Sequence, residues 1–401
     1  MRAMARRRLQ QPYNIQKGVF YEGLVATRAG SCDYASTGAS FPNAMSRSGH
    51  VAVVDIRKLK IAFGNFTTHP AGPAPESAVG GAITIKAGIE YNGNFSQILF
   101  NGQVTGSVSD GGMIISDYAI TPGPIPKGQT FQIRMFINGP NNWPFNQFSD
   151  IGKGDKLNYN NSPTDQTMGG TVTATNASFC ITPTAIIGMT DQPSVIAVGD
   201  SICAGKNDTS TISDFRRGLI CKGFPVDTLA FLNHGAFNNF TSDYMSNNPQ
   251  RTTLWKYGSH FPCNLGINDI AQNGVAAATV LSNLQTLIWP NFPPRARARV
   301  FQTTPTPVAT SSNSFINAAG QTTNANNSIR VTFCTTIRGG GIVGMRDYFE
   351  TAWLVEDAHD NGKWKSDGST VNLYTGDGTH ESPFGYTTGA GGIDMTKIFY
   401  P

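Results

Sequence analysis

The chain has 401 residues, of which 14% are charged and 39% are hydrophobic, and its formal net charge is +4. That charge comes from four arginines among the first eight residues, because the rest of the chain carries as many acidic as basic side chains. A balanced body argues against a nucleic-acid-binding protein, and the apolar and aromatic content excludes a disordered chain. No run approaches the roughly 18 consecutive apolar residues that a transmembrane helix requires.

The N-terminal segment, 1–18, is predicted to be a basic arm. It has the charges of a signal peptide but no apolar stretch behind them, so we expect no Sec signal. The low charge content, with 44 glycines and 23 prolines, is typical of rigid β-rich proteins of extracellular or particle-associated type. We therefore expect an extracellular or virion-associated protein. We also expect the arm to attach to a particle or to a second copy of the chain.

Residues 19–190 predict an all-β domain, a jelly-roll-like sandwich, because apolar and polar residues alternate with a period of two. This alternation occurs in three segments: 50–63, 83–91 and 131–137. The dipeptides Asn92-Gly93 and Asn101-Gly102 are typical of tight turns between strands. We predict loops for the Pro/Gly run 122–128 and the polar stretch 150–170.

Residues 191–401 predict a second domain, in which strands and helices alternate around a parallel sheet. Short apolar runs indicate three buried strands: Ser194–Val198, Thr228–Leu232 and Arg299–Thr303. Apolar residues between 280 and 288 follow the spacing of an amphipathic helix. The tail from Phe384 to Pro401 shows no helical period, so no helix is predicted there.

Ser201 is the best candidate nucleophile. It follows the first apolar strand of the second domain, and Gly199 allows a sharp turn, so its hydroxyl should lie at the carboxyl end of the sheet. Open α/β sheets place their active sites at that edge. Gly-Asp-Ser alone is a weak signal, and a simple turn residue is an equally good interpretation of Ser201.

A base for Ser201 is offered by Asp377 and His380. Their three-residue spacing puts both side chains on one face of a turn, so the carboxylate can accept the imidazole N–H. Glu356 and His359 have the same spacing, but their charged surroundings favour a solvated loop.

Asn268 and Asp269 come immediately before the predicted helix. Asp269 is a natural helix N-cap. Asn268 can instead direct its amide at a developing oxyanion, which stabilises the transition state of acyl transfer.

Together these elements make the second domain resemble the SGNH (GDSL-type) hydrolases. Gly199-Asp200-Ser201, Gly266-Ile267-Asn268-Asp269 and Asp377-Gly378-Thr379-His380 look like three blocks of that family and occur in its order, and Gly385-Tyr386 extends the third. The resemblance implies a three-layer, flavodoxin-like α/β fold with Ser201 as nucleophile, His380 as general base and Asp377 as its orienting carboxylate. Asn268 would donate to the oxyanion together with the Ser201 N–H.

The remaining family block departs from its pattern. Asn233-His234-Gly235-Ala236-Phe237-Asn238 fits NxGxxG except that Asn238 replaces the last glycine. By the resemblance, Gly235 and Asn238 line the oxyanion hole, and Asn tolerates a positive φ well enough to keep a backbone donor there. The segment 260–264 is less apolar than the family's usual strand, and the family's C-terminal helix is not evident.

The N-terminal half has a looser resemblance, to the accessory β-domain that precedes the catalytic block in some bacterial SGNH enzymes. It is carried by Ser116-Asp117, Ile125-Pro126-Lys127-Gly128 and the strand at 131–137. Three aromatic residues could line a platform for sugars, although ordinary core packing is the favoured interpretation: Trp143, Phe145 and Phe148.

The six cysteines show no CxxC pair, so no zinc site is predicted. Disulfides and buried thiols remain equally open for them. We predict a serine esterase, needing no metal or cofactor, that hydrolyses small acyl esters, O-acetyl groups on a polysaccharide being the first choice. The alternative is a structural or receptor-binding component of a phage particle with a vestigial or accessory hydrolase domain.

Overall fold

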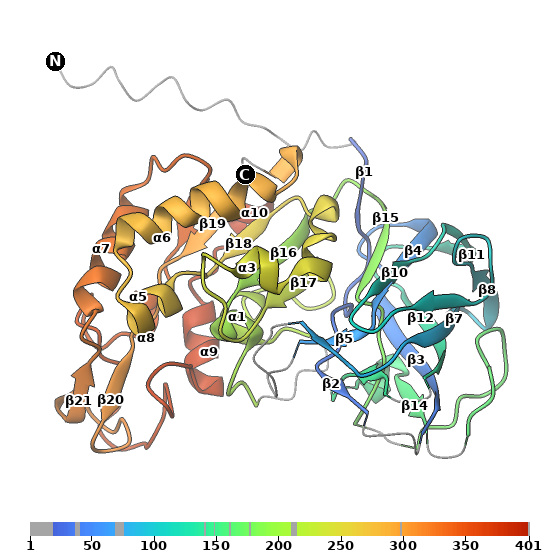
Figure 1. Cartoon of the computed structure of the whole chain (residues 1–401), viewed down its shortest axis with the longest axis horizontal. Coiled ribbons are helices and arrows are strands. Elements are labelled where there is room, and N and C mark those ends of the chain that lie inside the picture. The colour runs from blue at the N-terminus through green and yellow to red at the C-terminus, as the bar shows by residue number, and fades with distance from the viewer. Residues whose placement is uncertain are drawn as a thin grey trace.

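The computed structural model describes most of the chain, in nine segments: 19–36, 41–68, 76–139, 142–147, 149–159, 162–175, 178–209, 215–296 and 299–399. The predicted basic arm, 1–18, and Phe148 lie outside these residues. The β-rich N-terminal half and the α/β C-terminal half lie side by side (Figure 1). Within the described segments, no helix has the length and apolar character needed to cross a membrane.

The N-terminal half contains two main antiparallel sheets. In the first, the strands run in the order β1 (Tyr21–Leu24), β15 (Ala185–Thr190), β4 (Ile56–Gly64) and β10 (Met113–Ile115), and β11 (Ala119–Ile125) also pairs with β4. In the second, the order is β14 (Lys156–Asn158), β3 (Asn43–Val51), β12 (Thr130–Asn138), β7 (Ile83–Tyr91) and β8 (Asn94–Ile98), with β9 (Gly106–Val108) on β7. Smaller elements are the pairs β2 (Tyr34–Ala35) with β13 (Pro144–Phe145) and β5 (Phe66–Thr67) with β6 (Ser77–Ala78), and the 3₁₀ turn η1 (Ile151–Lys153).

The alternating pattern of the sequence places one face of each strand in the core. In β12 the alternate residues are fully buried: Phe131, Ile133, Met135 and Ile137. Asn92 and Asn101, each followed by glycine, have φ of 50° and 51°, as tight turns of this type require. Buried residues of both sheets belong to one hydrophobic cluster. The finer assignment to a jelly-roll-like sandwich stays a prediction.

Two of the predicted loops are partly wrong. The run 122–128 overlaps β11, whose register on β4 shifts between Ile120 and Ile125. Proline is tolerated in such an irregular strand because no regular ladder bond is lost there. The stretch 150–170 contains η1 and β14. The strand β14 pairs with β3, and its central residue Leu157 is fully buried.

The C-terminal half is built on a parallel sheet in the order β17 (Ala230–Gly235), β16 (Ser194–Gly199), β18 (Phe261–Cys263), β19 (Val300–Thr303) and β22 (Asp347–Phe349). This is the 2-1-3-4-5 order of flavodoxin-like sheets. The segment 260–264, weakly apolar in sequence, contains the buried strand β18.

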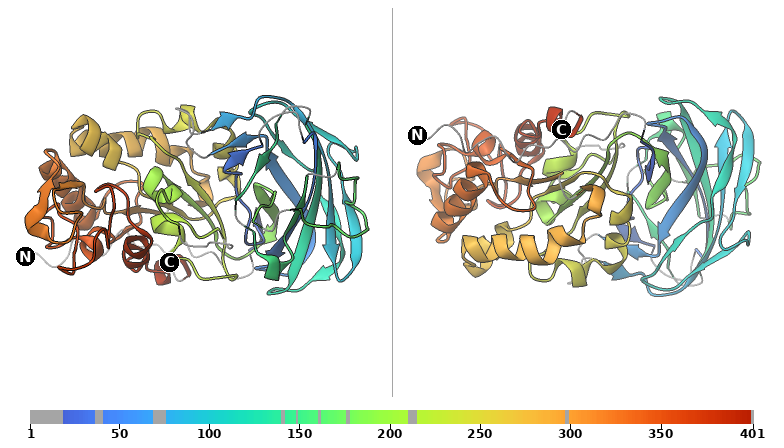
Figure 2. Two further views of the ribbon diagram at one scale, coloured as in Figure 1. Left: turned by 90° about the horizontal axis from the view of Figure 1, so that it is seen from below. Right: turned by 90° about the horizontal axis from the view of Figure 1, so that it is seen from above.

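Helices cover both faces of this sheet (Figure 2). Ile196 and Val198 of β16 share a core with Val280 and Leu284, whereas Val195 and Ala197 share one with Ile220 and Ile398. The helices are α1 (Ser201–Ala204), α2 (Gly218–Cys221), α3 (Tyr244–Asn247), α4 (Pro249–Thr252), α5 (Ile267–Asn273), α6 (Ala277–Asn283) with its π-helical continuation η3 (Leu284–Ile288), α7 (Asn327–Gly339), α8 (Ala352–Val355), α9 (Pro383–Ala390) and α10 (Thr396–Phe399). A short antiparallel pair, β20 (Ala309–Ser311) with β21 (Gln321–Thr323), projects from this half.

The prediction of no helix after Phe384 is wrong, because α9 and α10 lie there. The buried face of α9 consists mainly of small residues, so it shows no apolar stripe in the sequence and packs closely on its neighbours. A Cβ on Gly389 would lie 2.7 Å from Leu219 Cδ1. The sequence signal for this helix is Ser382-Pro383, a typical N-cap followed by proline in the first turn. In the structure Ser382 accepts a hydrogen bond from Gly385 N at 3.1 Å.

Candidate active site

Ser201 lies at the carboxyl end of β16, a strand between β17 and β18, where the strand order reverses. The turn before it requires glycine, because a Cβ on Gly199 would lie 1.7 Å from Asn264 Oδ1. Asp200 then caps α1: its carboxylate accepts from the Ile202 N–H at 2.9 Å. Ser201 is therefore the first residue of a helix, and its own N–H has no partner within that helix.

The residues predicted as base and orienting carboxylate meet Ser201 in one hydrogen-bonded chain. Ser201 Oγ lies 2.8 Å from His380 Nε2, and His380 Nδ1 lies 2.8 Å from Asp377 Oδ2. Ser201 is 6% exposed and His380 7% exposed, so solvent competes little for these hydrogen bonds. Because Asp377 faces Nδ1, we assign the ring proton to that nitrogen, which leaves Nε2 free to accept the Ser201 proton.

The loop that carries Asp377 and His380 is held by its own backbone. Gly378 has φ of 78°, and a Cβ there would lie 1.8 Å from Ala309 O. Its carbonyl accepts from Ala309 N at 2.9 Å and from Trp364 Nε1 at 3.0 Å. Thr375 Oγ1 donates to His380 O at 2.7 Å. These contacts attach the loop to β20 and set the direction of the imidazole.

Asp377 is kept charged by its hydrogen bonds. Burial alone would raise the pKa of its carboxyl group. The His380 ring and the N–H groups of His380 and Thr379 outweigh burial and hold that pKa well below its usual value. Asn207 adds a bond to Asp377 Oδ2 at 3.0 Å. The sequence offered no spacing signal for Asn207, because it lies 170 positions away in the loop after α1.

Asn268 and Asn238 both line the cavity that contains Ser201 and His380. The Asn268 amide nitrogen donates to Asn239 O at 3.0 Å, and its oxygen accepts from Gln272 Nε2 at 2.9 Å, so the side-chain orientation is set. Asn238 has φ of 54°, the positive value anticipated for the residue that replaces the family's glycine.

Asp269 is not the N-cap of its helix. Gly266 occupies that position, and Asp269 lies in the first turn of α5. Its carboxylate accepts from Thr241 N at 3.0 Å and from Thr241 Oγ1 at 2.7 Å. It therefore attaches the segment after Asn238 to α5, beside Asn268.

Gly235 does not have a free donor in the structure. Its N–H donates to Asn233 Oδ1 at 2.9 Å, and the residue lines a smaller neighbouring pocket. A Cβ on Gly235 would lie 2.2 Å from Ala204 N, so close packing of α1 on β17 explains the glycine. We therefore leave Gly235 out of the candidate oxyanion hole.

The cavity at Ser201 has a volume of about 360 Å³. Its apolar part comes from Ile267, Ala271 and Val308. The remaining lining is mostly polar, from several elements: Ser201, Lys206, Phe237, Asn238, Asn268, Gln272, Asn324, Thr379 and His380.

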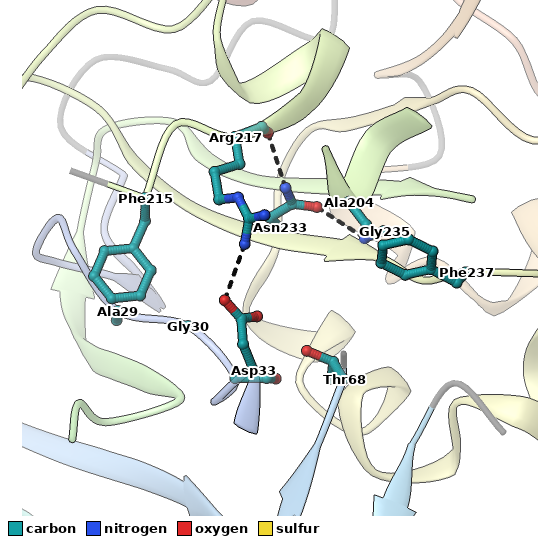
Figure 3. A pocket seen from close by; sticks show the side chains of 11 residues that line it. Ala29, Gly30, Asp33, Thr68, Ala204, Phe215, Arg217, Asn233, Gly235 and Phe237 are labelled. Atoms are coloured by element: carbon teal, nitrogen blue, oxygen red, sulfur yellow. Dashed lines mark hydrogen bonds and ion pairs between the residues drawn. The ribbon is translucent and has the colours of Figure 1, made fainter. Parts of the chain in front are cut away.

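A smaller pocket of about 50 Å³ lies between the two halves of the molecule (Figure 3). Phe237 lines both this pocket and the cavity at Ser201. Arg217 reaches across the pocket to Asp33 of the N-terminal half at 3.0 Å, and Asn233 donates to Arg217 O at 3.0 Å. These bonds connect the N-terminal half, through Arg217, to Asn233 of β17, four residues before Phe237.

Other candidates from the sequence are not part of this site. The solvated loop predicted around Glu356 and His359 is present at residues 357–359, which are exposed, but Glu356 itself is buried and paired with Arg330. His359 is exposed and stacks on Trp353, 4.0 Å between ring centroids. Trp143 is 2% exposed and packs edge-on against Phe145. The cysteines are free, buried thiols: Cys32, Cys180, Cys203, Cys221, Cys263 and Cys334.

Glu381, directly after the candidate base, was missed by sequence reasoning. The side chain is fully buried. Burial, together with the charges of Asp200 and Asp377, raises the pKa of its carboxyl group from 4.5 to about 8. Only the fold reveals this, because nothing in the sequence separates a buried glutamate from an exposed one.

We expect Glu381→Gln to stabilise the protein more at pH 8 than at pH 5. Between pH 4.5 and 8 the unfolded chain loses the Glu381 proton while the folded chain keeps it, so each rise in pH favours unfolding. Glutamine carries no such proton. The measurement is the denaturant midpoint of variant and wild type at both pH values, with the exposed Asp357→Asn as control. A midpoint difference that does not change with pH would contradict this.

Comparisons with known proteins were made for the whole chain. No family model matches it, and no curated protein matches it. Solved structures similar to it include a lipolytic protein of the G-D-S-L family from Veillonella parvula (14% identity, 51% of this chain and 97% of that one, TM-score 0.33). The native aryl esterase of M. smegmatis is another (12% identity, covering 51% of this chain and 98% of that one, TM-score 0.33). A third is an active-site mutant of a family two carbohydrate esterase from Clostridium thermocellum (11% identity, covering 93% of this chain and 98% of that one, TM-score 0.34).

These neighbours are GDSL-type esterases and a carbohydrate esterase, the class of protein that the sequence motifs resemble. The likenesses are distant, and a functional assignment rests on the geometry of the site.

Proposed function

We propose that this protein is a serine esterase in which Ser201, His380 and Asp377 form the catalytic triad. The observation that carries the proposal is the unbroken chain of hydrogen bonds from Ser201 Oγ through His380 to Asp377, with 2.8 Å at both steps. It begins at the wall of a cavity large enough for a small ester.

In the proposed mechanism, His380 Nε2 takes the Ser201 proton as Ser201 Oγ attacks the ester carbonyl. The Ser201 N–H, the second amide proton of Asn268 and the backbone N–H of Asn238 are the proposed donors to the oxyanion. His380 then gives its proton to the departing alcohol, which leaves an acyl group on Ser201. A water molecule then gives a proton to His380 Nε2 as it attacks the acyl-enzyme, and His380 returns that proton to Ser201 Oγ as the acyl–oxygen bond breaks and the acid leaves.

The proposed substrate is a short acyl ester, such as an O-acetyl group, on a carbohydrate. Ile267, Ala271 and Val308 provide a small apolar surface suited to a short acyl chain. The mostly polar remainder of the cavity suits a hydroxylated alcohol part. We also propose that the N-terminal half is a jelly-roll-like accessory domain that supports the cavity wall at Phe237.

The experiment is a panel of 4-nitrophenyl esters of increasing acyl length, assayed with wild type and Ser201→Ala, followed by acetate release from acetylated polysaccharides. We expect acetate to be the best acyl group. Equal rates for long-chain esters would contradict the short-acyl assignment, and no serine-dependent turnover would contradict the esterase itself.

We expect Asn268→Ala to lower kcat by about 10²- to 10³-fold with little change in KM, because an oxyanion donor acts mainly in the transition state. Asn268 also holds Asn239, so the variant's thermal midpoint must be measured beside its kinetics. Gln272→Ala is the comparison variant, since it removes a bond that orients Asn268 but keeps the donor, and its loss in kcat should be smaller. A kcat close to that of wild type in a folded Asn268→Ala would contradict a direct role for Asn268.

A further inference from the structure

Lys206 lies in the loop after α1, and its backbone is held on both sides. Its N–H donates to Ser201 O at 3.0 Å, and its carbonyl accepts from Tyr386 Oη at 2.8 Å. Two residues on, Asp208 is buried and paired with Lys222 at 2.7 Å. The point from which the Lys206 side chain extends is therefore fixed relative to the nucleophile.

The Lys206 side chain itself is exposed and lines the cavity that contains Ser201 and His380. Its ammonium group lies 6.0 Å from the centre of the Phe237 ring, at the outer limit of a cation–π contact. Among the described residues, no carboxylate lies within ion-pair distance of it. With its backbone fixed and no ion pair to a described carboxylate, the Lys206 ammonium group is available to bind a ligand.

The charge of the cavity is one-sided. Lys206 is the one lysine or arginine among its described lining residues, and no aspartate or glutamate lines it. Asp377 faces the Nδ1 side of the imidazole, whereas Ser201 faces Nε2. A cation that no carboxylate of the lining neutralises raises the local concentration of anions in a concave site and favours their binding.

The two kinds of lining come from different elements. The apolar residues belong to α5 and to the segment before β20, whereas Lys206 and Phe237 belong to the loops after α1 and β17. A short acyl group on the apolar residues leaves the alcohol part of the ester to Phe237 and Lys206. An aromatic ring beside a cation suits a sugar ring that carries a carboxylate.

We propose that Lys206 selects esters whose alcohol part carries a carboxylate, the class to which O-acylated uronic acids and other acidic sugars belong. The inference rests on the proposed esterase function and deepens it. Lys206 acts in binding and orientation, and the chemistry at Ser201 is the same for neutral and acidic esters.

The test compares two acetate esters of similar shape, the anionic 4-acetoxybenzoate and the neutral 4-acetoxybenzamide. The measured quantity is the ratio of their kcat/KM values, anionic to neutral. We expect Lys206→Gln to lower this ratio by about 3- to 10-fold and Lys206→Glu to lower it further, while Lys206→Arg keeps most of it. The wild-type ratio should also fall as salt is added. Lys127→Gln, at an exposed lysine in the turn between β11 and β12, is the matched control and should leave the ratio unchanged.

An unchanged ratio in Lys206→Gln and Lys206→Glu, with serine-dependent turnover of both esters, would overturn the role of Lys206 and leave the esterase standing. Failure of wild type to hydrolyse either ester faster than Ser201→Ala would overturn both. A ratio that falls equally in Lys127→Gln would show a general charge effect and would also overturn the assignment to Lys206.

Discussion

Ser201→Ala should abolish ester turnover, with a fall in kcat of about 10⁴-fold or more. In the proposed mechanism the hydroxyl is the attacking group, and its 2.8 Å contact puts His380 Nε2 within reach of its proton. Residual rates would come from the oxyanion donors alone. The measurement is the initial rate on 4-nitrophenyl acetate at saturating ester.

The controls for Ser201→Ala separate chemistry from folding. The substitution removes one oxygen at the start of α1 and leaves the Asp200 cap intact, so we expect an unchanged thermal midpoint. Ser369→Ala, in an exposed loop, should retain full activity. His380→Ala should lose as much activity as Ser201→Ala, and the double variant little more, because the two groups act as a unit. Full activity in a folded Ser201→Ala would contradict the triad.

Asp377→Asn should lower kcat by about 10³- to 10⁴-fold while leaving the fold intact. An asparagine amide facing His380 Nδ1 can donate to it. The ring proton then moves to Nε2, which can no longer accept from Ser201. Asn207, which donates to Asp377 Oδ2 at 3.0 Å, would also lose an acceptor in that orientation. A loss of less than about tenfold would indicate that His380 is oriented by other contacts.

Asp377→Asn should also change the pH dependence of the free energy of unfolding. The pKa of Asp377 is lower in the folded protein than its usual value of 3.8. Its contribution to stability is thus present above pH 3.8 and is lost as pH falls through the folded pKa. Wild type should therefore lose stability more steeply below about pH 4 than Asp377→Asn does, measured by denaturant midpoints from pH 3 to pH 6. Parallel curves would contradict the lowered pKa.

Local patterns were sufficient where the signal is local. Strand alternation in 131–137, the Asn-Gly turns and the glycine before Ser201 each reflect a constraint within a few residues, and the structure contains all of them. The helix α7 was missed because its β-branched residues are weak helix formers and one of its buried positions is Arg330, which pairs with Glu356. A buried charged residue interrupts the regular spacing of apolar residues from which an amphipathic helix is predicted.

The sequence by itself indicated which residues could carry acyl transfer, because Ser201, Asn268, Asp377 and His380 occur in blocks that resemble those of the SGNH hydrolases and follow their order. Only the tertiary structure decided which donors are free. It engages the Gly235 N–H with Asn233, turns Asp269 toward Thr241, brings Asn207 to Asp377, and puts Lys206 at the wall of the cavity. The physical reason is that hydrogen-bond partners and burial depend on distances between segments far apart in the chain, and a linear pattern does not contain those distances.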